Sequence, residues 1–165
     1  MAFVHAPGWQ APTGNILKAV ATGNGPRFGA YAVRFSGPDE KDLEGEYFTS
    51  ETDFGPRYGD GSPVLIHHGR AIAEGLEAFA SVILPAAKVH RDERGLFAST
   101  QLDLDDLLQA AVAELITSGA FRWSSGSRAD LTRREADGRI VRWPPLEFSL
   151  TPTPAEPRLP RLRPI

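Results

Sequence analysis

The sequence contains no cysteine, which excludes disulfide-stapled folds, thiolate zinc sites and cysteine nucleophiles. It also has no strong excess of either charge, with 18 Lys and Arg against 21 Asp and Glu. A protein that coats nucleic acid would carry a marked basic excess. No apolar run has the length of a membrane-spanning helix, and Met1–Gln10 lacks the charged and apolar regions of a secretory signal. We therefore expect no nucleic-acid and no membrane partner.

Motifs for metals and nucleotides are missing as well. The histidines are His5, His67, His68 and His90, and they form no His-Glu-x-x-His or similar metal-binding spacing. No glycine-rich phosphate loop follows an expected strand. We therefore expect neither a metal nor another cofactor.

The composition that is present suits one domain. The chain has 165 residues, of which 41 % are hydrophobic, enough for a single core. Glycine and proline are frequent, which indicates many turns and short strands. We expect a flexible N-terminal arm over residues 1–25, a folded β domain over residues 26–150 and a proline-rich extended tail over residues 151–165.

Hydrophobic alternation predicts several short strands. The segments are 27–35, 64–66, 96–102, 120–125, 140–143 and 146–150. Residues 71–80 have a helix-friendly composition, but Gly75 and the apolar run after it leave that segment ambiguous. The pattern predicts a mainly β (α+β) fold, a small antiparallel β-barrel of about six to seven strands with one or more covering helices.

One helix is predicted over residues 104–118. Its apolar positions recur with a helical period and include Leu104, Leu107 and Leu108. The Asp103–Asp106 run favours the helix start, and Gly119 is a typical residue to follow the last turn.

Three clusters carry residues suited to catalysis. The first is Leu65-Ile-His67-His68-Gly69, at the end of an expected strand. Imidazole is the side chain best suited to act as a general base near neutral pH. Adjacent residues of a strand point to opposite faces, so the two histidines rarely ligate one metal together, and at least one of them would face a cleft. The alternative interpretation is a loop histidine that is hydrogen-bonded to the backbone.

The second cluster is Trp123-Ser124-Ser125-Gly126-Ser127. A serine hydroxyl near a strand end, followed by glycine, is exposed and leaves space for a substrate. Serine is a weak nucleophile unless a base removes its proton, and His67 or His68 would be that base. The alternative is an ordinary polar turn.

The third cluster surrounds Glu147, which lies in the apolar run Leu146-Glu-Phe-Ser-Leu150. A carboxylate on such a strand must be paired or hydrogen-bonded. It would either orient a histidine, as in a catalytic triad, or form a salt bridge with an arginine.

In this order, the clusters resemble the prohead protease family of tailed phages, which are capsid-maturation serine proteases that share a fold with herpesvirus assemblins. The resemblance spans about Phe28 to Pro157. The matching segments are Gly29-Ala-Tyr-Ala-Val-Arg-Phe35, Val64-Leu-Ile-His-His68-Gly69, Asp92-Glu-Arg-Gly-Leu96, Trp123-Ser-Ser-Gly126 and Glu147-Phe-Ser-Leu-Thr-Pro-Thr-Pro-Ala-Glu-Pro157.

The resemblance assigns roles to these residues. It implies that Ser124 is the nucleophile and His68 the general base, with Ser125 and His67 as the competing choices. Glu147 would be the carboxylate that orients the histidine. The position after His68 is Gly69, where the family more often has aspartate.

The same resemblance implies a biological setting. The substrates would be the scaffold protein and the major capsid protein, inside an assembling prohead in the host cytoplasm. Dimer formation would follow by fold analogy with assemblins. The alternative is a catalytically inactive capsid-assembly or scaffold-type binding module on the same fold.

Overall fold

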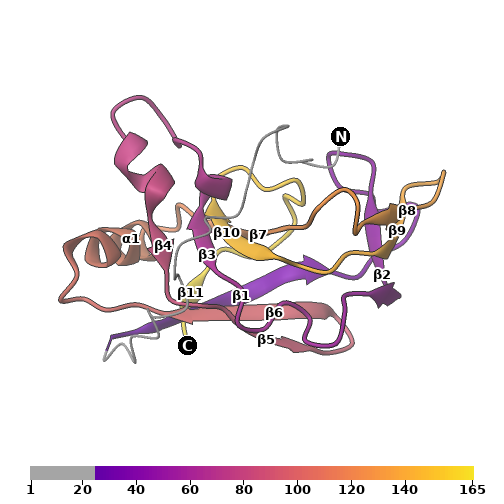
Figure 1. Cartoon of the computed structure of the whole chain (residues 1–165), viewed down its shortest axis with the longest axis horizontal. Helices are drawn as coiled ribbons and strands as arrows, with labels where there is room; N and C mark the ends of the chain where they lie inside the picture. Colours follow the sequence, from indigo (N-terminus) through magenta and orange to yellow (C-terminus); the bar gives the residue numbers. More distant parts are fainter. Residues whose placement is uncertain (1–24) are drawn as a thin grey trace.

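The computed structural model describes residues 25–165. The arm expected over residues 1–25 therefore lies, except for Gly25, outside the described residues. The described chain is 36 % strand and 13 % helix, so the mainly β prediction is confirmed. Its strands form three sheets (Figure 1).

The first sheet has the strand order β11-β1-β6-β5 and is antiparallel throughout. Its strands are β1 (Arg27–Arg34), β5 (Lys88–Arg91), β6 (Gly95–Gln101) and β11 (Arg163–Pro164). The two residues of β11 come from the proline-rich tail, so the last residues of the tail pair with β1 at the edge of this sheet.

The second sheet carries the candidate site and has the order β4-β3-β10-β7. Its strands are β3 (Val64–Ile66), β4 (Ile83–Leu84), β7 (Arg122–Gly126) and β10 (Glu147–Thr151). The central strand β10 pairs in parallel with β3 and antiparallel with β7. Segments far apart in the chain, from 64 to 151, are therefore neighbours in this sheet.

The third sheet has the order β2-β9-β8, with β2 and β9 parallel. Its strands are β2 (Tyr47–Asp53), β8 (Arg133–Arg134) and β9 (Arg139–Arg142). The sequence did not indicate β2, because this strand is mostly polar: its outer residues face solvent and the pattern of buried positions is weak.

The prediction of a small antiparallel β-barrel is confirmed only in its coarser part, the mainly β character with one α-helix. Within residues 25–165 the strands form separate sheets and no closed barrel, and two of the strand pairs are parallel. Hydrophobic alternation identifies a strand and its buried face, but it carries no information about which strand pairs with which.

The helix α1 (Leu107–Thr117) is shorter than expected. It begins three residues late because the Asp106 carboxylate accepts hydrogen bonds from the N–H groups of Leu108 and Gln109, at 2.9 and 3.1 Å, and so caps the helix. The helix ends at Thr117, and Gly119, two residues later, has a φ of 78°, the left-handed value typical after a last turn.

The buried face of α1 also differs from the prediction. Val112, Ala113 and Ile116 are buried, whereas Leu104, Leu107 and Leu108 are exposed. The buried positions of α1 therefore lie in its later turns. The ambiguous segment 71–80 forms no α-helix; a short 3-10 helix, Glu77–Ser81, covers its last residues instead.

The main core lies between the first two sheets and α1 (Figure 1). Trp123 of β7 and Phe148 of β10 are fully buried there, with their rings 6.2 Å apart. The indole N–H of Trp123 donates to the Ala98 carbonyl of β6 at 3.1 Å, which ties the two sheets together. With Trp123 and Phe148 facing the core, Ser124 and Glu147 point to the opposite face of the second sheet.

Candidate functional site

Strand β10 presents a row of polar side chains on the face away from the core. Glu147, Ser149 and Thr151 alternate with the core residues Phe148 and Leu150, and each is at most 1 % exposed. Buried polar groups are unfavourable unless they are hydrogen-bonded. All three are satisfied by the turn that follows β3, and this turn carries the two histidines.

Glu147 is paired with His68 and not with an arginine. Its Oε1 lies 2.7 Å from Nδ1 of His68, and its Oε2 accepts a hydrogen bond from the Ser149 hydroxyl at 2.6 Å. No arginine forms an ion pair with Glu147 among residues 25–165. The salt-bridge alternative raised by the sequence therefore does not describe this carboxylate.

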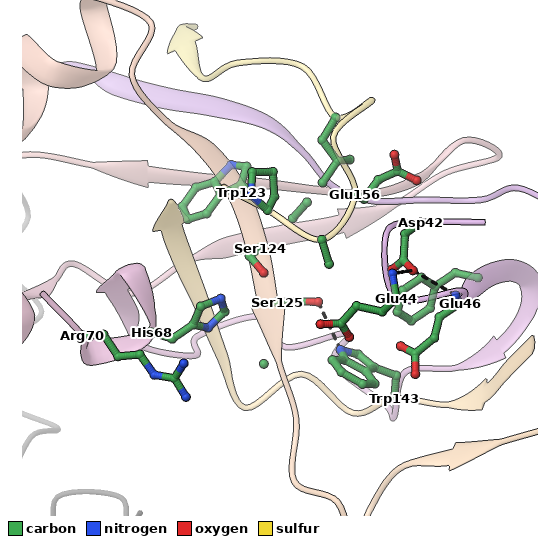
Figure 2. A pocket seen from close by; sticks show the side chains of 16 residues that line it. Asp42, Glu44, Glu46, His68, Arg70, Trp123, Ser124, Ser125, Trp143 and Glu156 are labelled. Atoms are coloured by element: carbon green, nitrogen blue, oxygen red, sulfur yellow. Dashed lines mark hydrogen bonds between the residues drawn. The ribbon is translucent and has the colours of Figure 1, made fainter. Parts of the chain in front are cut away.

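This pairing defines the state of the His68 ring. A carboxylate is only an acceptor, so Nδ1 of His68 carries the proton that joins the two groups. In the neutral imidazole the other nitrogen, Nε2, then has the lone pair and is the atom that can take a proton. Figure 2 shows the ring turned toward the strand that carries Ser124.

Ser124 lies on β7 directly opposite Ser149 in the antiparallel register, on the same sheet face as Glu147. Ser124 and His68 line the walls of the same two adjoining pockets, together with Arg70 and Ala155. No hydrogen bond joins Ser124 to His68 within the described residues. Catalytic hydrogen bonds are often long before substrate binds, so a serine and a base that share a pocket are compatible with proton transfer between them.

The two competing residues are placed differently. The Ser125 hydroxyl accepts a hydrogen bond from the Trp143 indole N–H at 3.1 Å, and Figure 2 shows it directed away from His68. Nδ1 of His67 lies 2.8 Å from the Thr151 hydroxyl. Burial, with smaller contributions from His68 and Arg70, lowers the pKa of His67.

Gly126 has a role that the sequence did not reveal. We expected this glycine to leave space for a substrate, but the space above it is filled by the Glu147 side chain. A Cβ on Gly126 would lie 2.0 Å from Oε1 of Glu147. Glycine is therefore required here because the carboxylate passes over the neighbouring strand on its way to His68. Ser149 and Thr151 were also missed, since a serine and a threonine on a strand carry no distinctive signal.

One wall of the pocket that both Ser124 and Ser125 line is acidic. Asp42, Glu44, Glu46 and Glu156 line it, and Figure 2 shows Glu44 directed toward the Ser125 side of β7. Burial raises the pKa of Asp42, Glu44 and Glu46 above the ordinary values. Arg134 contacts Glu46 at 2.6 Å, and Arg158 pairs with Glu156.

The described residues also bear on metal sites and membrane spans. Among residues 25–165, no group of three or more His, Asp and Glu side chains could hold a metal ion. In that same part of the chain, no helix is long and apolar enough to cross a membrane.

Comparison with known proteins adds no family assignment. The chain matches no protein-family model, no curated protein and no solved structure. The geometry of Ser124, His68 and Glu147, together with the order of the sequence motifs, therefore carries the functional argument.

Proposed function

We propose that this chain is a serine endopeptidase in which Ser124 is the nucleophile, His68 the general base and Glu147 the carboxylate that orients the base. One observation carries the proposal. A buried carboxylate holds Nδ1 of His68 at 2.7 Å, and the same imidazole shares a pocket with Ser124. Hydrolases on unrelated folds use such a carboxylate–imidazole pair to activate a serine.

The reaction would proceed in two halves. Nε2 of His68 takes the proton of the Ser124 hydroxyl as its oxygen bonds to the scissile carbonyl carbon. Collapse of the tetrahedral intermediate breaks the C–N bond, and the leaving amine takes the proton from His68. Water, deprotonated by the same nitrogen, then attacks the ester, and Ser124 regains its proton as the acid product leaves.

Glu147 would act through charge. Imidazole becomes positively charged in each half-reaction, and a negative charge 2.7 Å from Nδ1 stabilises that form. The Glu147 side chain is only 1 % exposed, so this side of the site is shielded from water.

The biological setting is proposed from the sequence motifs. Five segments in the order of the prohead protease family support capsid maturation in a phage or prophage, with scaffold and major capsid protein as substrates. The proposed place of action is the assembling prohead in the host cytoplasm, and a homodimer is part of the same analogy.

The test has two parts. Purified chain is treated with a fluorophosphonate, which labels activated serines, and the modified residue is located by peptide mass analysis. The chain is also co-expressed with the capsid and scaffold proteins encoded beside it, and intact masses are recorded. We expect labelling at Ser124 and cleavage of the partners, both lost in Ser124→Ala and retained in Ser125→Ala.

The second candidate is an inactive assembly module on the same fold. It is favoured by the lack of a hydrogen bond between Ser124 and His68 in the described residues. Two results together would favour the inactive module over the protease: Ser124 of the wild type is not labelled, and the capsid and scaffold proteins stay intact in assembled particles.

A further inference from the structure

The turn after β3 has an unusual backbone. His67, His68 and Gly69 are three consecutive residues with positive φ, at 47°, 58° and 69°. Glycine adopts this left-handed region freely, but residues with a Cβ do so at an energetic cost. Two strained histidines in succession persist only where the surroundings hold them, and such strain is concentrated at functional sites.

Strand β10 provides that support. We call Glu147, Ser149 and Thr151 the β10 ladder, since they occupy alternate positions on one strand face. Glu147 binds the His68 ring, the Ser149 hydroxyl accepts the His68 backbone N–H at 3.1 Å, and Thr151 binds the His67 ring at 2.8 Å. Because β3 runs parallel to β10, with Ile66 opposite Leu150, the turn passes directly alongside the ladder.

The hydrogen bonds of Ser149 fix the direction of its hydroxyl, whereas at Thr151 the donor and acceptor roles depend on the His67 tautomer. The Ser149 oxygen accepts from the His68 N–H, and its own hydrogen goes to Oε2 of Glu147. The Thr151 oxygen accepts from the Thr153 N–H at 3.2 Å. Within residues 25–165 the acceptor placed for the Thr151 hydrogen is Nδ1 of His67. A neutral imidazole that accepts a hydrogen bond at Nδ1 carries its proton at Nε2.

We propose that Ser149 and Thr151 are positioning residues, and that the β10 ladder holds the two neighbouring histidines in opposite tautomers. His68 is protonated at Nδ1, toward Glu147, which leaves Nε2 as the base. His67 is protonated at Nε2 and is thereby kept out of the proton transfer. The catalytic consequence rests on the proposed function, whereas the tautomers do not.

Ser149 is the central member because it contacts both partners of the catalytic pair. Through Oε2 it fixes the rotation of the Glu147 carboxylate, and through the His68 N–H it fixes the backbone from which the ring projects. Without its hydroxyl, the carboxylate can turn and the strained turn can relax. At metal sites, substitution of a residue that orients a ligand through a hydrogen bond typically lowers affinity or activity about 10- to 100-fold, and we expect a similar range here.

The test measures tautomers and reactivity separately. The full chain, with 15N-labelled histidine, is examined by long-range 1H–15N NMR at a pH where the imidazoles are neutral. The rate of fluorophosphonate labelling at Ser124 is measured on the same samples. The variants are Ser149→Ala, Ser149→Thr and Thr151→Val, with Ser127→Ala as the matched control. Ser127 is a buried serine whose hydroxyl binds the Pro144 carbonyl and not the turn.

We expect opposite tautomers for His67 and His68 in the wild type. Ser149→Ala should mix the tautomers of His68 and slow labelling about 10- to 100-fold, and Ser149→Thr should restore much of both. Thr151→Val should change the signals of His67 and slow labelling less. Ser127→Ala should lower thermal stability without moving either imidazole.

Two results would overturn the inference: the same tautomer at both histidines in the wild type, or unchanged His68 signals in a folded Ser149→Ala. If Ser124 is never labelled but the tautomers behave as expected, the ladder stands and the protease proposal fails. If labelling occurs but the tautomers do not depend on Ser149, the protease stands and the ladder fails. Should Ser149→Ala not fold, Thr151→Val decides: unchanged His67 signals in that folded variant would overturn the inference.

Discussion

Gly126 and Glu147 are direct partners across two strands, and the glycine lies beneath the carboxylate of the glutamate. The register places them opposite each other, and a Cβ at position 126 would come within 2.0 Å of Oε1. The hydrogen at that position is what lets Glu147 reach His68. The motif Ser-Ser-Gly and the distant Glu-Phe-Ser motif are thus coupled by a steric requirement between strands.

Gly126→Ala should displace the Glu147 carboxylate. The backbone at Gly126 has no positive φ, so the effect is steric and not conformational. We expect a loss of about 1–3 kcal/mol in the free energy of unfolding, typical of overpacking, and labelling of Ser124 at least about 10-fold slower. Gly37→Ala is the control, because a Cβ there meets nothing within 4 Å. Equal behaviour of the two variants in denaturant titration and labelling would show that the close approach is unimportant.

Glu147→Gln should keep the shape of the side chain but lose its ability to accept hydrogen bonds from both His68 and Ser149. The carboxylate accepts on both oxygens, from His68 and from Ser149, whereas an amide has one acceptor and one donor. The amide therefore cannot serve both partners, and the imidazolium loses its countercharge. We expect the rate of Ser124 labelling to fall by about 10² to 10⁴. A folded variant, judged by circular dichroism, that labels at the wild-type rate would remove Glu147 from the mechanism.

Arg134→Ala should destabilise the acidic wall of the pocket. Glu46 is 4 % exposed and its Oε1 lies 2.6 Å from the Arg134 guanidinium. A buried carboxylate left without its partner is unfavourable, although the arginine side chain itself is 47 % exposed and partly screened. We expect a loss of about 1–2 kcal/mol at pH 7 in urea unfolding. Arg133→Ala on the same strand is the control, since Arg133 forms no ion pair within residues 25–165, and an equal loss there would exclude the pair as the cause.

His67 should make the fold sensitive to mild acid. Its pKa is lowered from the ordinary 6.5 in the folded state, chiefly by burial. The unfolded chain therefore binds a proton more tightly than the folded chain, and stability falls as the pH drops from about 6.5 through the lowered value. His67→Gln should flatten the pH dependence of the melting temperature over that range. A wild-type profile that is already flat between pH 7 and 5.5 would contradict this assignment.

The acidic wall should favour cationic peptides. Asp42, Glu44, Glu46 and Glu156 line the pocket that contains Ser124, and opposite charges speed encounter in a salt-dependent way. Matched peptides with lysine, glutamine or glutamate beside the cleavable bond should be cut in that order of kcat/KM at low salt. Glu44→Gln should reduce the difference, and Glu93→Gln, on the β5–β6 turn, should not. An unchanged ranking in Glu44→Gln would assign the preference to another part of the chain.

Local patterns in the sequence were sufficient for several elements of the fold. The alternation near Phe28 and Leu96 predicted β1 and β6, and Gly119 was correctly placed after the helix. The same patterns did not show which strands pair, which is why no closed barrel is found among the described residues and the parallel pairing of β3 with β10 was unforeseen. Burial is a property of layers, so the exposed Leu107 could not be distinguished from the buried Ile116 by spacing alone.

For the site, the candidate residues could be identified in the sequence from the chemistry of their side chains, whereas their contacts depend on the tertiary structure. The sequence by itself narrowed the candidate reactive groups to serine, histidine and carboxylate, because cysteine is absent and no metal spacing is present. It also determined that a glutamate in an apolar run needs a partner. Only the folded sheet decided that the partner is His68, that Ser125 turns to Trp143, and that Ser149 contacts both members of the pair. The physical reason is that a hydrogen bond depends on positions within a few tenths of an ångström, and these positions are set by strand register between segments more than 70 residues apart.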